Sequence, residues 1–380
     1  MKSASSNVGL YIHIPYCQKK CPYCAFYSEP VEQNNPESLV DALFMELERY
    51  AITEPVETVY IGGGSPTCLS PDLLTELVIS LLSQYKEVQE FTIECNPAQA
   101  DERLFEKLRE LGVNRVSIGA QSLNAKELQT LGRIHQPQQI AQAVQIARAA
   151  GFDNISIDLI FGIPGSTVDT WRYSLETAAS LGVQHISAYS LTIEKATPFD
   201  RAVKEGTLSL VDEPTDRAMY ETARQILNAA GFFQYEISNF AKPGFECRHN
   251  LRYWKNLPVV GIGPAAAGWY KGKRTTNIPD IAAYIEKTEN HQFAYTEEHI
   301  PTPEQITCET AVLGLRTTSG IDMHEFEKQT GFDLIMLFGN AIKQHCASGL
   351  LECTADNHCR LTEKGLSYAD TVGSDFTSLD

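Results

Sequence analysis

The sequence predicts an α/β protein: a partial TIM-like (β/α)6 barrel followed by a small C-terminal winged-helix-like α+β domain. First, short apolar runs rich in Val and Ile alternate with amphipathic segments through the first two-thirds of the chain. This pattern is typical of parallel strands that are buried on both faces. Second, several predicted helices end in glycine, which is a C-cap signal. Third, the tail combines short helices with a β-hairpin, the order found in winged helices.

The predicted strands of the barrel are residues 10–15, 58–62, 91–95, 115–120, 155–160 and 186–191. The predicted helices between and after them are residues 37–50, 71–85, 101–111, 137–150 and 167–181. Repeated β-α units close in a right-handed sense, and the active sites of such barrels lie at the C-terminal ends of the strands.

The pattern changes after residue 192. Residues 232–240 are predicted as one further strand, and the Gly- and Pro-rich stretch 241–278 is predicted to be irregular. The expected domains are therefore a barrel, an irregular connecting region and a winged-helix-like domain, over residues 1–240, 241–300 and 301–380.

Composition limits the class of protein. The formal charge of −17 argues against a nucleic-acid partner, because phosphate binding needs clustered Lys and Arg. No apolar run approaches the roughly 20 residues that span a bilayer, although a peripheral membrane contact stays open. The first seven residues lack the apolar core of a signal peptide, and ten cysteines are too few for a disulfide scaffold of this length. We expect a cytoplasmic protein.

Three cysteines follow the first predicted strand: Cys17, Cys21 and Cys24, at C-x3-C-x2-C spacing. Iron–sulfur clusters are held by thiolates and normally take four protein ligands, so one iron here could stay open for another ligand. The alternatives are three buried structural cysteines or a zinc knuckle with a distant fourth ligand. Zinc sites usually show paired C-x2-4-C elements, and no second pair is present. The spacing therefore favours a cluster.

Polar groups recur where the predicted strands end. The run 62–67 (Gly-Gly-Gly-Ser-Pro-Thr) follows the second strand, Glu94 lies in the third and Gln121 follows the fourth. Arg133 comes after a short helix, and Asp158 lies within the apolar fifth strand. Each could be structural by itself, but their recurrence next to the cysteine loop predicts a shared site.

These motifs together identify a resemblance that covers essentially the whole chain. The chain resembles the branch of the radical S-adenosylmethionine (SAM) superfamily that contains oxygen-independent coproporphyrinogen III oxidases and their heme-chaperone relatives. The matching runs are Tyr-Ile-His-Ile-Pro-Tyr-Cys (11–17), Gly-Gly-Gly-Ser-Pro-Thr (62–67), Glu-Cys-Asn-Pro (94–97), Gly-Ala-Gln-Ser (119–122), Leu-Gly-Arg-Ile-His (131–135) and Asp-Leu-Ile-Phe-Gly-Ile-Pro-Gly (158–165).

The resemblance implies that the three cysteines ligate a [4Fe-4S] cluster whose open iron chelates the amino and carboxylate groups of SAM. It implies SAM contacts from Tyr11, Gly63, Gly64, Ser65, Glu94, Gln121, Arg133 and Asp158. In this scheme Glu94 accepts hydrogen bonds from the ribose hydroxyls, and Arg133 and Asp158 serve the charged ends of SAM.

Small features favour the heme-chaperone branch. The oxidases carry a further cysteine where this chain has Phe26, and they have a longer segment before the cluster loop than the 16 residues found here. The heme-chaperone relatives carry a His-Asn-x-x-Tyr-Trp motif, which is complete here as residues 249–254. The resemblance thus implies a chaperone that binds the cluster, SAM and heme and transfers heme to an unidentified acceptor protein. It implies no catalytic residue.

The sequence also fits two other functions and a structural role for the His-Asn-x-x-Tyr-Trp motif. The chain could be a coproporphyrinogen III oxidase that forms protoporphyrinogen IX, or a radical SAM protein with an unrelated substrate. His249 is the expected axial ligand of heme iron, since imidazole is a common heme ligand. The structural alternative is a short helix that caps the barrel, with His249 hydrogen-bonded and Tyr253 and Trp254 in the core. A second His common in relatives is replaced by Ala267.

Overall fold

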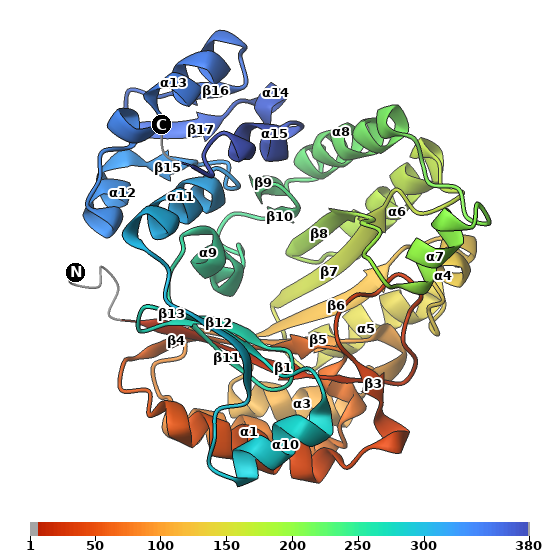
Figure 1. Cartoon of the computed structure of the whole chain (residues 1–380). Helices are drawn as coiled ribbons and strands as arrows, with labels where there is room; N and C mark the ends of the chain where they lie inside the picture. Colours follow the sequence, from red (N-terminus) through yellow and green to blue (C-terminus); the bar gives the residue numbers. More distant parts are fainter. Residues whose placement is uncertain (1–6, 379–380) are drawn as a thin grey trace.

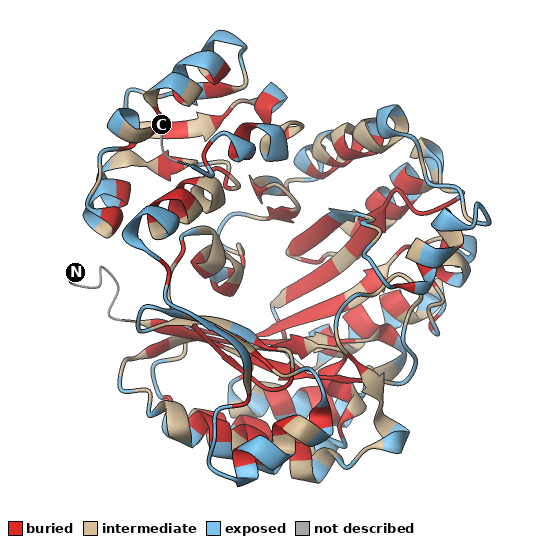
Figure 2. Ribbon diagram, viewed as in Figure 1, coloured by how far each residue is buried: buried red, intermediate tan, exposed pale blue. Residues whose placement is uncertain are grey.

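The computed structural model describes residues 7–378, so nearly all of the N-terminal segment used for the signal-peptide expectation lies outside the described residues. Within the described range, twelve strands form one open, strongly curved sheet with helices on its outer face, and a small domain lies beside it (Figure 1). Buried residues concentrate in the central strands and on the helix faces that meet them (Figure 2).

Six parallel strands form the centre of the sheet and confirm the predicted partial (β/α)6 barrel. They pair in the order β1 (Val8–Ile14), β4 (Val56–Gly63), β5 (Glu90–Cys95), β6 (Arg115–Gln121), β7 (Asn154–Phe161) and β8 (His185–Ser190). Their aliphatic residues are fully buried on both faces, which explains why they read as continuous apolar runs. The strand predictions agree with these bounds to within two residues.

The crossover helices begin at hydrogen-bonded caps. Asn35, Ser70, Asp101 and Thr167 accept backbone N–H groups at the starts of α1 (Pro36–Tyr50), α2 (Pro71–Gln84), α3 (Glu102–Leu111) and α6 (Val168–Ser180). The remaining helices of the barrel are α4 (Ala125–Thr130), α5 (Pro137–Ala149), α7 (Pro198–Lys204) and α8 (Glu213–Ala229). Two short strands, β2 (Tyr16–Cys17) and β3 (Glu29–Pro30), pair in parallel and close the cysteine loop.

The structure differs from the prediction after residue 231. The single strand predicted over 232–240 is a hairpin, β9 (Phe233–Glu236) and β10 (Asn239–Ala241), and β10 runs antiparallel to β8. The stretch predicted to be irregular holds helix α9 (Arg248–Trp254) and three strands, β11 (Val259–Ile262), β12 (Ala267–Tyr270) and β13 (Lys273–Asn277). Helix α10 (Ile281–Glu289) and strand β14 (Tyr295–His299) follow.

The prediction that residues 241–278 are irregular was wrong because glycine allows strands to pack closely as well as forming turns. Strand β11 pairs in parallel with β1 and extends the barrel sheet. A Cβ atom on Gly261 would lie 2.3 Å from the carbonyl oxygen of Ala267, so the antiparallel β11–β12 contact requires glycine at this position. The three-part domain division itself stays a prediction.

The C-terminal elements follow the order of a winged helix. They are α11 (Pro303–Gly314), β15 (Ile321–Asp322), α12 (Met323–Thr330), α13 (Leu334–Ala347), β16 (Leu351–Cys353), β17 (His358–Leu361), α14 (Glu363–Leu366) and α15 (Ala369–Ser374). Strands β15, β17 and β16 form a separate small sheet. The two-residue strand β15 was not predicted, because it is too short to show a periodic pattern.

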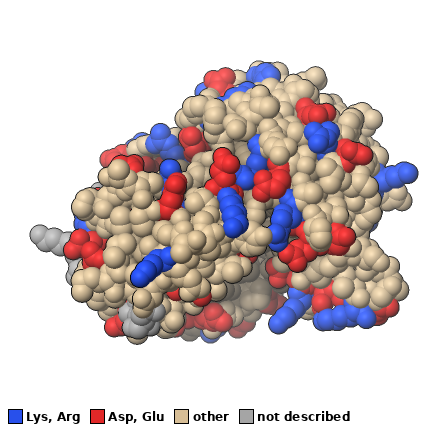
Figure 3. All heavy atoms as spheres, turned by 90° about the horizontal axis from the view of Figure 1, so that it is seen from above, with Lys and Arg blue, Asp and Glu red and all other residues tan. Residues whose placement is uncertain are grey.

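Charged side chains lie scattered over the face seen in Figure 3, with basic groups among acidic ones. None of the helices in residues 7–378 has the length and apolar character needed to cross a membrane.

Glu46 joins three elements beneath the sheet. This residue of α1 is 1% exposed. Its carboxylate accepts the Gly263 N–H at 2.9 Å, the Tyr284 hydroxyl at 2.6 Å and the Asn277 amide at 2.8 Å. The carboxylate therefore ties α1 to α10, to the residue that follows β11 and to the last residue of β13.

We expect Glu46→Ala to lower the free energy of unfolding by about 3 kcal/mol or more, because it leaves three buried donors without an acceptor. Glu48→Ala, on the exposed side of the same helix, is the matched control and should change stability by less than about 0.5 kcal/mol. The measurement is urea unfolding followed by circular dichroism. Equal midpoints for the two variants would contradict this role of Glu46.

Candidate functional site

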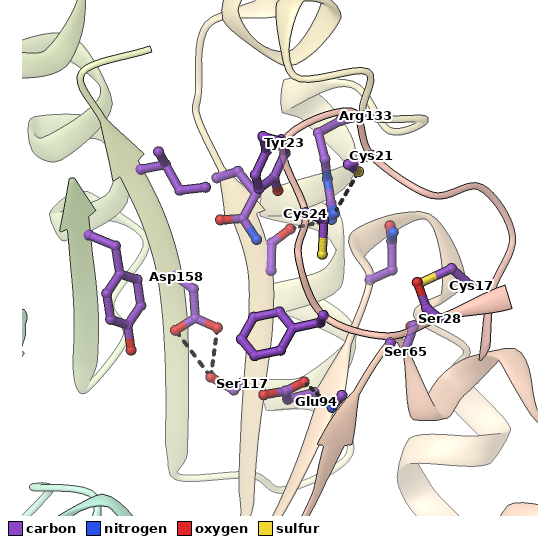
Figure 4. Close-up of a pocket in the computed structure, with 18 of the residues that line it drawn as sticks. Cys17, Cys21, Tyr23, Cys24, Ser28, Ser65, Glu94, Ser117, Arg133 and Asp158 are labelled. Carbon is purple, nitrogen blue, oxygen red and sulfur yellow. Dashed lines mark hydrogen bonds between the residues drawn. The ribbon is translucent and has the colours of Figure 1, made fainter. Parts of the chain in front are cut away.

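One cavity of about 680 Å³ brings together nearly all of the predicted site residues. It opens at the cysteine loop and extends into the barrel (Figure 4). The predicted residues that line it are Cys17, Cys21, Cys24, Gly63, Gly64, Ser65, Glu94, Gln121, Arg133 and Asp158. The prediction missed several lining residues, among them Tyr60, Arg115, Ser117, Ser187, Tyr189 and Asn250.

The three cysteines present their thiols to this cavity from one loop. The Cys24 N–H donates to the Cys21 carbonyl at 3.2 Å, which gives the loop a tight turn. Burial raises the pKa of Cys17 to about 11, and the neighbouring thiols Cys68, Cys24 and Cys21 act in the same direction. Within the described residues no three His, Cys, Asp or Glu side chains converge as a metal site. Thiols crowded in one desolvated place nevertheless fit an iron cluster, because coordination to the cationic iron would favour their thiolate form.

Arg133 lies beside the cysteine loop (Figure 4). Its Nη1 is 3.7 Å from the Cys21 sulfur, and its Nη2 donates to the Gly119 carbonyl at 2.8 Å. The preceding residue, Gly132, has φ of 69°, and a Cβ there would lie 2.7 Å from Pro22. This glycine lets the loop of Arg133 pack directly on the cysteine loop, so the guanidinium faces the cavity mouth.

The triple glycine runs along the end of β1. The Gly64 N–H donates to the Ile14 carbonyl at 2.9 Å, and the Ser65 N–H donates to the Tyr16 carbonyl at 2.7 Å. A Cβ on Gly64 would lie 2.4 Å from that Tyr16 oxygen. Glycine is therefore required for the approach of the two backbones, and the bare backbone borders the cavity next to the cysteines.

Glu94 lies slightly deeper than Gly63, and Gln121 lies nearer the cavity mouth, at the end of β6. Glu94 accepts the Tyr60 hydroxyl at 2.8 Å and the Gly63 N–H at 3.1 Å. Burial raises the pKa of Glu94 to about 7, and the nearby Asp158 carboxylate adds to the effect. Gln121 ends β6 with a left-handed φ of 66°, a strained conformation for a non-glycine residue. Such strain is common at functional sites and fits a side chain held at the cavity wall.

Asp158 lies inside a strand, as predicted, and not at the strand's end. It lies in the middle of β7 and accepts hydrogen bonds from the Ser117 hydroxyl at 3.0 Å and the Ser187 hydroxyl at 2.7 Å. Burial raises the pKa of Asp158. The cavity is deep enough to reach it from the mouth, so this mid-strand carboxylate still lines the cavity.

Tyr11 does not line the cavity. Its hydroxyl is 3.0 Å from His13 Nδ1, and its ring packs against those of Tyr60 and His249. A SAM contact from Tyr11 therefore has no support in this arrangement. His13 is a satisfied barrel histidine, since its Nε2 is 3.0 Å from the Tyr27 carbonyl.

His249 is also outside the cavity. Its Nδ1 is bonded as the structural alternative expects, whereas its buried Nε2 has no hydrogen-bond partner. It is 1% exposed, and its Nδ1 is 2.9 Å from the Thr58 hydroxyl, near the N-terminal end of β4. Burial lowers the pKa of His249 to about 3, with help from the charges of Arg252 and Arg115. Helix α9 thus closes the barrel at the N-terminal ends of its strands, and heme iron could reach His249 only if that helix moved. The motif residue that does line the cavity is Asn250.

Comparison with known proteins agrees with this architecture. The model of the radical SAM superfamily matches residues 11–178, and that of the HemN C-terminal domain matches residues 302–368. The chain is 36% identical over 378 residues to the heme chaperone HemW of Bacillus subtilis, which spans 98% of both chains. It is 33% identical to HemW of Lactococcus lactis over 96% of both chains.

A solved structure of coproporphyrinogen III oxidase (HemN) from Escherichia coli has the same fold. The TM-score is 0.84 at 21% identity, over 97% of this chain and 90% of the oxidase chain. The family matches confirm the predicted [4Fe-4S] cluster and SAM as cofactors. The full-length identity to the curated relatives decides the branch, and the chain therefore belongs to the HemW heme-chaperone family of the radical SAM superfamily.

Proposed function

We propose that this protein is a heme chaperone that carries a [4Fe-4S] cluster and SAM, binds heme and transfers it to an acceptor protein. The observation that carries the proposal is the sequence identity of 36% and 33%, over nearly the whole chain, to two proteins named heme chaperone HemW. The complete motif at residues 249–254 and the cavity beside the cysteine loop support it. We place this activity in the cytoplasm, as composition and cysteine content suggest.

In this proposal the cavity mouth holds both cofactors. Cys17, Cys21 and Cys24 would hold the cluster, and a reduced cluster would supply one-electron chemistry next to SAM. The glycine backbone at 63–64 borders the methionine end. Glu94 accepts hydrogen bonds from the ribose, and Arg133 and Asp158 balance the charged groups.

The oxidase alternative has less support. Phe26 stands where the oxidases carry a further cysteine, and this side chain is 67% exposed at the cavity mouth. The likeness to the oxidase structure is at 21% identity and concerns the fold alone.

Cys21→Ser should abolish the brown chromophore of anaerobically reconstituted protein, because a hydroxyl is a poor ligand for cluster iron. The wild type should hold about four irons per chain. Cys353→Ser removes an exposed cysteine of the C-terminal sheet and is the control that keeps the full spectrum. A normal cluster spectrum in the Cys21 variant would contradict the assignment of Cys21 as a cluster ligand.

Asp158→Asn should weaken SAM binding about tenfold or more while iron content stays the same, because it removes a charge that faces a cationic ligand. Isothermal titration of the reconstituted protein with SAM measures the effect. Asp153→Asn, exposed just before β7, should bind SAM as the wild type does. Loss of iron together with the fold in Asp158→Asn would show a purely structural residue.

Heme titration tests the function itself. The wild type should bind heme with a Soret band, and it should form no protoporphyrinogen IX from coproporphyrinogen III and SAM. His249→Ala should keep heme affinity and Soret position but lose thermal stability, because the imidazole is buried against Thr58. A lost Soret band with an intact cluster spectrum would instead show that α9 moves to deliver His249 to iron. Product above a no-enzyme control would favour the oxidase.

A further inference from the structure

A buried guanidinium without a partner lies at the floor of the cavity. Arg115 is the first residue of β6, is 1% exposed and lines the cavity. Its Nε has no hydrogen-bond partner, and in the part of the chain that the structure describes its guanidinium makes no hydrogen bond or ion pair. Arginine stays protonated at every working pH, and buried charges are normally paired. An unpaired one that faces a cavity is suited to an anionic ligand.

The nearby carboxylates are already engaged by other donors. Glu90 accepts the backbone N–H groups of Arg248 at 3.0 Å and His249 at 2.9 Å. Asp158 accepts the hydroxyls of Ser117 and Ser187. The charge of Arg115 interacts with both carboxylates, but among residues 7–378 neither forms an ion pair with the guanidinium. Its donors therefore stay free for a group that enters the cavity.

Asn250 adds a second donor from the other side of the floor. It belongs to α9 and lines the same cavity, and among the described residues its side-chain amide makes no hydrogen bond. Arg115 and Gln121 mark the two ends of β6, about 20 Å apart along an extended strand, and both line the cavity. The cavity therefore runs from the cofactor mouth to α9.

We propose that Arg115 and Asn250 form an oxyanion subsite at the cavity floor, which receives a carboxylate of the bound ligand. The planar fork of the guanidinium matches a carboxylate with two parallel hydrogen bonds, and the amide supplies a third donor. The identity of the ligand rests on the proposed function: heme carries two propionate carboxylates. Phe26, Tyr189 and Leu191 line the same cavity and offer apolar surface for the ring.

The test compares heme with heme dimethyl ester, which has the same ring but no free carboxylate. Anaerobically reconstituted wild type should bind the ester about tenfold or more weakly than heme, because a charge-assisted hydrogen bond is lost. Arg115→Met should bind heme about as weakly as the wild type binds the ester and should no longer distinguish the two, whereas Asn250→Leu should reduce the preference for heme without abolishing it. Arg248→Gln removes a cation from the exposed side of α9 and should preserve the preference.

Two further measurements distinguish the proposed subsite from a structural role of Arg115 and from a role in binding SAM. Arg115→Met should melt at or above the wild-type temperature, because it removes an unpaired buried charge, whereas a structural role predicts a lower melting temperature. The SAM affinity of both floor variants should stay unchanged. A fall in SAM affinity with the preference for heme intact would assign Arg115 to the SAM carboxylate and overturn the proposal.

The binding of heme and its ester by the wild type gives two further outcomes that would contradict the proposal. Equal binding of heme and its ester would overturn the subsite and leave heme binding in place. If the wild type binds neither compound, the proposed function fails, and the subsite fails with it.

Discussion

The contact on which the site depends is the carboxylate of Glu90 at the start of helix α9. Glu90 is buried at the first position of β5, and it accepts the first two backbone N–H groups of α9. The N-cap residue Cys247 offers no side-chain cap of its own, so this distant carboxylate satisfies the helix end and complements its positive partial charge. Because α9 closes the lower end of an open barrel, this contact sets how deep the cavity is.

The same helix connects the cavity to the C-terminal domain. Beyond its last residue, the Asn256 amide donates to the Thr310 hydroxyl at 3.0 Å, and Gln329 donates to the Asn256 carbonyl at 3.2 Å. The ring of Trp254 lies under the Arg316 guanidinium, 4.7 Å from ring centroid to Cζ. The motif at residues 249–254 thus divides its contacts among three neighbours: β4, the cavity and the C-terminal domain. This division gives the motif a structural reason independent of iron ligation.

The sequence predicted what local periodicity and spacing encode. The barrel strands were found because strands buried on both faces are continuous apolar runs, and the cysteine loop was found by spacing alone. Strands β11 to β13 were missed because Gly261 and its neighbours look like a loop, although close strand contact requires them. Arg115 was missed for a related reason. A charge at the first position of a strand resembles a solvated end, and only the barrel's closure by α9, distant in sequence, buries it.

The cavity arranges its charges in layers, and each layer suits a different part of a ligand. Arg133 and the thiols occupy the mouth, where a cationic cluster would complement the thiols and a carboxylate would complement Arg133. Glu94 and Asp158 lie below the mouth, and burial raises the pKa of each carboxyl group. A cationic or hydroxyl-bearing ligand would therefore stabilise these carboxylates by replacing the water that burial excludes. Arg115 and Asn250 lie at the floor, where the guanidinium offers donors only and the amide offers donors beside its own acceptor oxygen. A ligand with one sign of charge would fit only one layer, whereas the alternation from mouth to floor favours a cofactor and a second, carboxylate-bearing molecule held in the same barrel.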